Sequence, residues 1–308
     1  MVANSPELPH LHGVVPPLAT PLRPDESVDA AALARLVEFV LGAGVHGLWA
    51  LGTTGRFDLL PDASQRIVAE TVAEASGGRV PLVLNVSDQG TKKTLARAAM
   101  FDDLPYDYYT ALPPWFFSMT PAEVIDYFTA LADGLSKPLV IYNAPWVVNR
   151  LTLAQLRQVA QHPRIVGCKD GDPGFTRTLD WPVEERRQVG FSYLHAYDQM
   201  ALSAQVGADG FVSAMGNPFP ELCVAIWDAV RADDAERAFR LQTQLTRLAQ
   251  AFGNGPLFAV VEAFCRHRGL FDRMLPAPLR SLDADASARV AAIVDAVGVR
   301  PDTELART

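Results

Sequence analysis

The sequence predicts an α/β fold, a (β/α)8 TIM barrel with a C-terminal helical extension. Eight short apolar runs occur along the chain, and nearly all are followed by a segment with helical periodicity, as in a parallel barrel joined by crossover helices. The length of 308 residues is compatible with one such barrel. A doubly wound sheet would need fewer strands, and no GxGxxG motif follows the first run.

The apolar runs are bounded by turn residues, which is typical of buried strands. In chain order, the predicted strands are residues 14–19, 47–51, 80–85, 106–112, 138–142, 165–169, 189–194 and 210–214. Pro16 and Pro17 interrupt the first of them. The predicted helices between the strands are residues 28–41, 62–75, 91–101, a helix beginning near Thr120-Pro121, 153–160, 201–206 and 221–232. Asp29 is a candidate N-cap of the first helix.

From Asp234 onward the pattern is wholly helical. Predicted helices cover residues 236–252, 256–268 and 286–297. We therefore divide the chain into a barrel, residues 1–232, and a C-terminal helical bundle, residues 233–308. No linker rich in Pro, Gly and Ser separates the two, so we expect the bundle to pack against the barrel.

The composition argues against several classes of partner. The net charge is −8 and no cluster of lysines and arginines occurs, which argues against a nucleic-acid surface. No apolar run reaches the length of about 18 residues that a membrane span needs, and the first twelve residues lack the apolar core of a signal peptide. The three cysteines form no CxxC pair, and an odd number cannot all be paired in disulfides within one chain, which indicates a reducing compartment. We expect a soluble, cytoplasmic protein with no membrane or nucleic-acid partner.

Lys169 is an unusual residue at the end of a buried strand. It closes the apolar run of residues 165–168, and a turn containing Gly171 follows. Burying an ammonium group is costly without a partner or a shifted pKa. A lone strand-end lysine more often lies along the core with its head in water. The alternative is a nucleophilic amine that desolvation keeps partly neutral, able to attack a ketone.

Two more motifs fall at strand ends, where barrel enzymes have their active sites. Gly52-Thr53-Thr54-Gly55 follows the second strand, and Tyr142 ends the fifth. The two glycines let the backbone approach a ligand, and the two threonines can hold a carboxylate. Each motif alone is more often a turn or a packed aromatic residue. Their joint occurrence with the strand-end lysine favours a site.

From about Gly13 to the C-terminal helices, the chain resembles the class I aldolase superfamily of dihydrodipicolinate synthase, N-acetylneuraminate lyase and 2-keto-3-deoxy sugar-acid aldolases. The matching segments are Ala19-Thr20-Pro21, Gly52-Thr53-Thr54-Gly55, Tyr142-Asn143-Ala144-Pro145, Gly167-Cys168-Lys169-Asp170 and Gly207-Ala208-Asp209-Gly210 with Asn217. As a set these motifs are specific, and the resemblance implies the same fold.

The resemblance also implies roles for individual residues. Lys169 would form a Schiff base with the ketone of pyruvate or another 2-keto acid. Tyr142 would shuttle protons, oriented by Thr53. Thr54 and the backbone amides of its loop would receive the substrate carboxylate. The other substrate-binding candidates are Gly52, Gly55, Val212, Phe116, Trp146, His195 and Arg56.

The resemblance requires neither a cofactor nor a metal. Of the six histidines only His195 lies at a predicted strand end, and no second ligand stands at metal-binding spacing. The expected ligand is a small-molecule 2-keto acid. We also expect a homo-oligomer, either a dimer or a tetramer.

Three departures from the family pattern bear on the substrate. Phe116 stands where many members have a tyrosine that enters a neighbouring subunit's site to complete the proton relay. The apolar residues 146–148 stand where members that bind aspartate semialdehyde have an arginine, and Arg150 is the nearest cation. Arg56 replaces a common glutamate. Phe116 can equally well be an aromatic residue at a subunit interface, and Arg56 can equally well form a surface or inter-subunit salt bridge. Together the departures argue against the synthase reaction.

We therefore predict a class I aldolase or lyase acting on pyruvate and a 2-keto acid, of the 2-keto-3-deoxy sugar-acid type. One alternative is a dehydratase, in which the same Schiff base expels water instead of an aldehyde. Another is a dihydrodipicolinate synthase-like protein that binds keto acids through Lys169 but has weak or lapsed activity because of Phe116.

Overall fold

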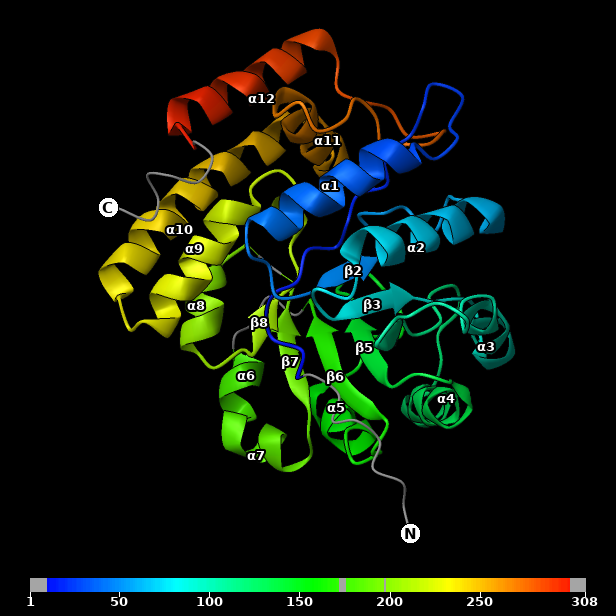
Figure 1. Ribbon diagram of the computed structural model, residues 1–308. Coiled ribbons are helices and arrows are strands. Elements are labelled where there is room, and N and C mark those ends of the chain that lie inside the picture. Colours follow the sequence, from blue (N-terminus) through cyan, green and yellow to red (C-terminus); the bar gives the residue numbers. More distant parts are fainter. Residues whose placement is uncertain (1–9, 172–175, 197, 300–308) are drawn as a thin grey trace.

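The computed structural model describes residues 10–171, 176–196 and 198–299. Eight parallel strands form a barrel with helices around it, as the sequence predicts (Figure 1). The strands are β1 (Gly13–Val14), β2 (Leu48–Ala50), β3 (Leu82–Asn85), β4 (Tyr108–Ala111), β5 (Leu139–Asn143), β6 (Ile165–Asp170), β7 (Ser192–His195) and β8 (Gly210–Phe211). Every strand residue except Val166 is buried, because both faces of a parallel sheet are covered.

The seam between β1 and β2 closes the barrel. Pro17 forms a parallel bridge with Trp49. The Trp49 amide donates to the carbonyl of Pro16 at 3.0 Å, and the Leu18 amide donates to the carbonyl of Trp49 at 2.8 Å. Because the two prolines have no N–H to donate, the regular part of β1 ends at Val14 and is shorter than the predicted strand.

Helices connect the strands and surround the barrel. They are α1 (Ala30–Gly42), α2 (Asp62–Ser76), α3 (Thr91–Ala99), α4 (Pro121–Gly134), α5 (Leu153–Val159), α6 (Thr176–Asp180), α7 (Val183–Gln188), α8 (Met200–Gln205), the 3-10 turn η1 (Ala214–Gly216) and α9 (Pro220–Arg231). Asp29 caps α1, as predicted, and Thr120 and Thr152 begin α4 and α5 with capping boxes. No helix in the described ranges is long and apolar enough to cross a membrane.

The segment between β6 and β7 differs from the prediction. The structure has two short helices there, α6 and α7, where the sequence pattern showed none. The predicted strand over 189–194 begins too early, because Val189 is the C-cap of α7 and Gly190 follows with a φ of 66°. Both helices are short and α7 is mostly charged, so neither presents an apolar stripe long enough to detect.

The C-terminal extension consists of α10 (Ala235–Ala249), the 3-10 turn η2 (Gln250–Asn254), α11 (Leu257–His267) and α12 (Ala284–Val297). It packs against the barrel: α10 lies along α8 and α9, and α12 lies across α10 and α11 (Figure 1). The Phe264 ring meets that of Phe219 with 5.2 Å between centroids, and Arg268 pairs with Glu221 at 2.7 Å. A boundary after residue 232 stays our proposal. Residues 1–9 and 300–308 of the two predicted domains lie outside the described residues.

Candidate active site

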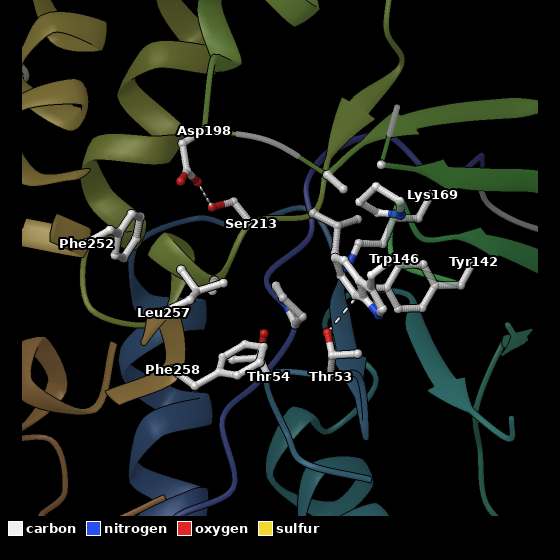
Figure 2. A pocket seen from close by; sticks show the side chains of 16 residues that line it. Thr53, Thr54, Tyr142, Trp146, Lys169, Asp198, Ser213, Phe252, Leu257 and Phe258 are labelled. Atoms are coloured by element: carbon white, nitrogen blue, oxygen red, sulfur yellow. Dashed lines mark hydrogen bonds between the residues drawn. The ribbon is translucent and has the colours of Figure 1, made fainter. Parts of the chain in front are cut away.

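A cavity of about 240 Å³ lies at the carboxyl ends of the barrel strands (Figure 2), the end at which barrel enzymes carry their active sites. Its described lining consists of Pro17, Thr53, Thr54, Tyr142, Pro145, Trp146, Lys169, Gly171, Ala196, Asp198, Val212, Ser213, Ala214, Phe252, Leu257 and Phe258. The three residues predicted to be catalytic, Lys169, Tyr142 and Thr53, are therefore brought together in one cavity.

Lys169 reaches this cavity from β6 and is almost completely shielded from water. The residue is 4% exposed, and its Nζ lies 4.1 Å from the centroid of the Tyr142 ring and 5.5 Å from that of Trp49. Desolvation lowers the pKa of the Lys169 amine to about 7. A substantial share of the amine is then neutral at neutral pH, which is the form that attacks a carbonyl carbon.

Tyr142 stands directly beside Lys169. The two residues are partners in the parallel register of β5 and β6, so their side chains project from the same face of the sheet. The Tyr142 hydroxyl lies 3.1 Å from Oγ1 of Thr53, and either oxygen can donate this hydrogen bond (Figure 2). A phenol held in this way next to an amine can carry protons to and from groups bound there.

The loop between β2 and α2 carries both threonines in a strained conformation. Leu51 and Arg56 flank it with φ angles of 55° and 57°, a region that costs a non-glycine residue about 1–2 kcal/mol. A side chain at Gly55 would place its Cβ 3.0 Å from the carbonyl oxygen of Leu18, so the loop packs tightly against the segment that follows β1. Thr54, which is 2% exposed, lies at the cavity wall.

A buried polar network lies behind Lys169. Asp170, which is 1% exposed, accepts hydrogen bonds from Asn143 at 3.1 Å, from Arg177 at 3.0 Å and from the hydroxyl of Tyr193. These partners belong to β5, α6 and β7. Because side chains alternate along a strand, Asp170 points to the opposite face from Lys169 and fixes the strand end that carries it.

Asp198 and Ser213 line the cavity although the sequence analysis did not select them. The Ser213 hydroxyl donates a hydrogen bond to the Asp198 carboxyl (Figure 2). Desolvation raises the pKa of this carboxyl, and the bond from Ser213 opposes the rise. Asp198 follows β7 and Ser213 follows β8. Position just after a strand end was therefore a signal that could have found both.

Three apolar residues of the C-terminal extension also line the cavity. Phe252 belongs to η2, and Leu257 and Phe258 begin α11. They lie far along the chain from the strand ends, and no strand-end pattern points to them. Only the packing of the extension on the barrel brings them to the site.

The eight predicted substrate-binding residues divide into two groups. Thr54, Val212 and Trp146 line the cavity. The other five, Gly52, Gly55, Phe116, His195 and Arg56, lie outside its described lining. A side chain at Gly52 would make ordinary contact with Trp49 and Pro17, so this glycine, like Gly55, lies close to the segment that follows β1.

His195 lies on the outer face of the barrel. It is buried, with Nε2 2.6 Å from the Thr178 hydroxyl and Nδ1 2.9 Å from that of Ser203. Its register partner on β6 is Asp170, not Lys169, so the ring faces the surrounding helices. Position at a strand end was therefore not enough to predict that His195 lines the cavity, because neighbouring residues of a strand point to opposite faces of the sheet. Among the described residues, no three His, Cys, Asp or Glu side chains gather in a way that could hold a metal ion.

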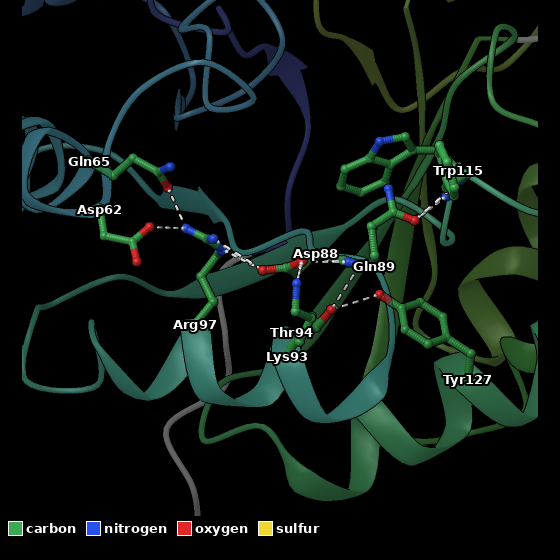
Figure 3. Close-up of polar contacts among 10 residues, drawn as sticks. Asp62, Gln65, Asp88, Gln89, Lys93, Thr94, Arg97, Trp115 and Tyr127 are labelled. Carbon is green, nitrogen blue, oxygen red and sulfur yellow. Dashed lines mark hydrogen bonds and ion pairs between the residues drawn. The ribbon is translucent and has the colours of Figure 1, made fainter.

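Arg56 and Phe116 also point elsewhere. The Arg56 guanidinium pairs with Asp58 at 2.5 Å and lies 5.1 Å from the centroid of the Phe258 ring. Phe116 is 73% exposed, on a loop held by Gln89, whose side-chain oxygen accepts the backbone N–H groups of Trp115 at 3.1 Å (Figure 3) and of Phe116 at 3.2 Å. Arg56 therefore supports a wall residue of the cavity, and the phenyl ring of Phe116 lies at the protein surface.

The fold and the site define a class I, pyruvate-dependent aldolase or lyase built on a (β/α)8 barrel. A family model described as the Dihydrodipicolinate synthetase family matches residues 10–297, and the chain belongs to this family. Members of the family are lyases and aldolases, and this protein is a lyase.

Individual relatives differ in the reaction that their names give. An uncharacterized DapA-like lyase of Halobacterium salinarum is 32% identical over 293 residues, which cover 94% of this chain and 95% of that protein. A probable 2-dehydro-3-deoxy-D-pentonate aldolase of Escherichia coli K12 is 28% identical over 94% of this chain and 98% of its own. The solved dihydrodipicolinate synthase of Bacteroides thetaiotaomicron is 26% identical, with a TM-score of 0.87, over 93% of this chain and 98% of that one.

Proposed function

We propose that this protein is a Schiff-base aldolase that cleaves a 2-keto-3-deoxy sugar acid reversibly to pyruvate and an aldehyde. The observation that carries the proposal is the desolvated Lys169 amine beside the Tyr142–Thr53 hydroxyl pair. The name of the Escherichia coli relative, a probable 2-dehydro-3-deoxy-D-pentonate aldolase, supports this substrate class.

In the cleavage direction, the neutral Lys169 amine attacks C2 of the keto acid, and loss of water gives an iminium ion. Tyr142, oriented by Thr53, takes the proton of the C4 hydroxyl. The C3–C4 bond then breaks, its electron pair forms the enamine, and the aldehyde leaves. Proton return to C3 and hydrolysis of the imine release pyruvate and restore the amine.

The two sides of the cavity suit the two ends of such a substrate. Thr54 lies on the wall near Thr53, where its hydroxyl and the loop amides would receive the keto-acid carboxylate. Asp198 and Ser213, which follow β7 and β8, offer a carboxyl and a hydroxyl to a hydroxyl group of the aldehyde portion.

A second carboxylate on the acceptor would be poorly accommodated. Asp198 is the acidic residue among the described lining residues, and Lys169 is the cationic one, used for the imine. Arg150 and Arg56 are not part of that lining, and Arg56 pairs with Asp58. Binding a partly desolvated carboxylate without a cation beside it costs on the order of several kcal/mol. We therefore expect an uncharged aldehyde to be preferred over aspartate semialdehyde.

Two measurements test the proposal. Pyruvate with borohydride should add a reduced three-carbon adduct to the peptide that contains Lys169, and Lys169→Arg should abolish both the adduct and turnover. A panel of 2-keto-3-deoxy acids, with pyruvate and free aldehyde measured separately, should then show cleavage.

The panel also separates the alternatives. Loss of water without aldehyde release would identify a dehydratase. An adduct with no turnover of any panel member would identify a keto-acid binder and overturn the proposed reaction. For condensation with pyruvate, a higher kcat/KM for aspartate semialdehyde than for glyceraldehyde would instead support the synthase reaction.

A further inference from the structure

The cavity presents unlike surfaces to the two ends of a bound substrate. Lys169, Tyr142 and Thr53 lie on one side, and Phe252 and Leu257 lie on the side opposite them (Figure 2). The side chains of the C-terminal extension that line it, these two and Phe258, carry no polar atom. The far part of the cavity is thus largely hydrocarbon.

This apolar wall is fixed in place from behind. The Phe252 ring packs against that of Phe264, with 6.3 Å between centroids, and the Phe258 ring lies under the Arg56 guanidinium at 5.1 Å. Leu257 is held at the start of α11. Arg56 therefore helps to position the apolar wall through its contact with Phe258. It belongs to the same loop as Thr53 and Thr54, so this one loop contacts both ends of the site.

Polar groups on this far side are few among the described residues. Asp198 and Ser213 provide them, and the two are hydrogen-bonded to each other. Together they can form hydrogen bonds with one hydroxyl group of a substrate. A second hydroxyl at the end of the chain would face Phe252 and Leu257, where it gives up part of its water without gaining a hydrogen-bond partner among the described residues.

We infer that the substrate is a 2-keto-3-deoxy acid whose chain ends in a methyl group, so that the aldehyde product is of the lactaldehyde type rather than glyceraldehyde. This inference rests on the proposed aldolase function. Breaking the C3–C4 bond of such a six-carbon acid gives pyruvate and lactaldehyde with no other reactant, since the C4 hydroxyl becomes the aldehyde and its proton returns to C3. The C5 hydroxyl meets Asp198 and Ser213, and the terminal methyl meets the apolar wall.

The test compares kcat/KM for condensation of pyruvate with lactaldehyde and with glyceraldehyde, using both enantiomers of each. An apolar pocket discriminates a methyl from a hydroxymethyl group modestly, so lactaldehyde should be preferred by roughly 10–100-fold. Leu257→Asn should bring this ratio close to one by offering the hydroxyl a partner. Leu279→Asn is the matched control, because Leu279 is 38% exposed against 44% for Leu257 and lies outside the cavity lining. It should leave the ratio unchanged.

Borohydride trapping with pyruvate is measured on the native protein and on both variants, since it reports whether Lys169 still forms an imine. An adduct without condensation of either aldehyde means that the proposed aldolase function fails. Condensation with equal or better use of glyceraldehyde, or a ratio that Leu257→Asn does not change, overturns the inference about the methyl terminus and leaves the aldolase function standing.

Discussion

The chemistry of Lys169 depends on its surroundings more than on any charged partner. Its pKa falls from 10.5 in the unfolded chain to about 7 in the folded one, through desolvation. Between these values the unfolded chain binds more protons, so the contribution of this residue to the free energy of unfolding rises with pH across that window. Below about pH 7 the buried amine is charged and its cost to the fold is largest.

The same pKa predicts a pH dependence for the first chemical step. The rate of adduct formation at Lys169 with pyruvate and cyanoborohydride, a hydride donor that survives mild acid, should rise about tenfold per pH unit below pH 7 and level off above it, because only the neutral amine attacks. Peptide mass spectrometry after short incubations from pH 5 to 9 measures this rate. A rate that still rises tenfold per pH unit at pH 9 would mean that the amine is solvated, contrary to its burial.

The proton shuttle is tested at Tyr142. Tyr142→Phe should lower kcat by about 10²–10⁴, the usual contribution of a positioned acid–base group, with little change in Tm. Thr53→Val, which removes the hydrogen bond to the phenol, should also lower kcat but by less. Tyr106→Phe is the matched control, because that buried hydroxyl bonds the Ala69 carbonyl away from the cavity. Equal rates for Tyr142→Phe and the native protein would assign the shuttle to another group.

The sequence predicted the part of the site that lies at strand ends and follows known motifs. Lys169, Tyr142 and Thr53 line one cavity because the register of β5 and β6 pairs the first two and the β2 loop reaches the phenol. Leu257 could not be found in this way, since tertiary packing alone places it there. His195 was selected by strand position without regard to side-chain alternation.

At the scale of elements, apolar runs identified all eight strands, and helical periodicity identified the long helices. The missed helices α6 and α7 are too short to show a period, and polar residues dominate α7. The ends of β1 and β7 were misplaced for backbone reasons, prolines in one case and the C-cap of a helix in the other. Sequence patterns therefore predicted which strands and long helices exist better than they predicted the residues at which these begin and end.

The network that joins β5, β6 and β7 predicts a large stability effect. Asp170→Asn should lower the free energy of unfolding by about 3–5 kcal/mol, because Arg177 would be left without its buried carboxylate. Urea denaturation measures the change. Asp133→Asn serves as control: Asp133 is 70% exposed and pairs with His162 at the surface, so its loss should cost less than about 1 kcal/mol. Similar costs for the two variants would show that the network does not anchor the strands.

At the scale of the whole molecule, the rim of the barrel carries an apolar ridge made of Phe116, Phe117, Trp146 and Val148. These side chains are 73%, 76%, 62% and 55% exposed. Asn149 joins the two loops that carry them, donating to the carbonyl of Phe117 at 2.7 Å. Large apolar groups gathered on one surface are typical of interfaces between subunits.

The ridge therefore agrees with the expected homo-oligomer, dimer or tetramer, which stays a prediction. Sedimentation velocity should show a species at least twice the mass of one chain. Phe117→Ser should shift it toward monomer, because the substitution removes apolar area from the ridge. Phe239→Ser, at a residue on α10 that is 46% exposed, should leave the mass unchanged. A native protein that sediments as a monomer would contradict the prediction.

The pairing of β1 with β8 has a consequence for the way the chain is made. Val14 can pair with Phe211 only after all the residues between them have been synthesised, roughly 10–40 s later at about 5–20 residues per second. Until then the growing sheet has two open edges, and the amine of Lys169 has no enclosing cavity around it. Nascent chains stalled before Phe211 should be cut readily by protease, whereas released chains resist. The ring is completed only after Phe211 has emerged, and the amine of Lys169 is enclosed later still, when Phe252 and Leu257 of the C-terminal extension have followed.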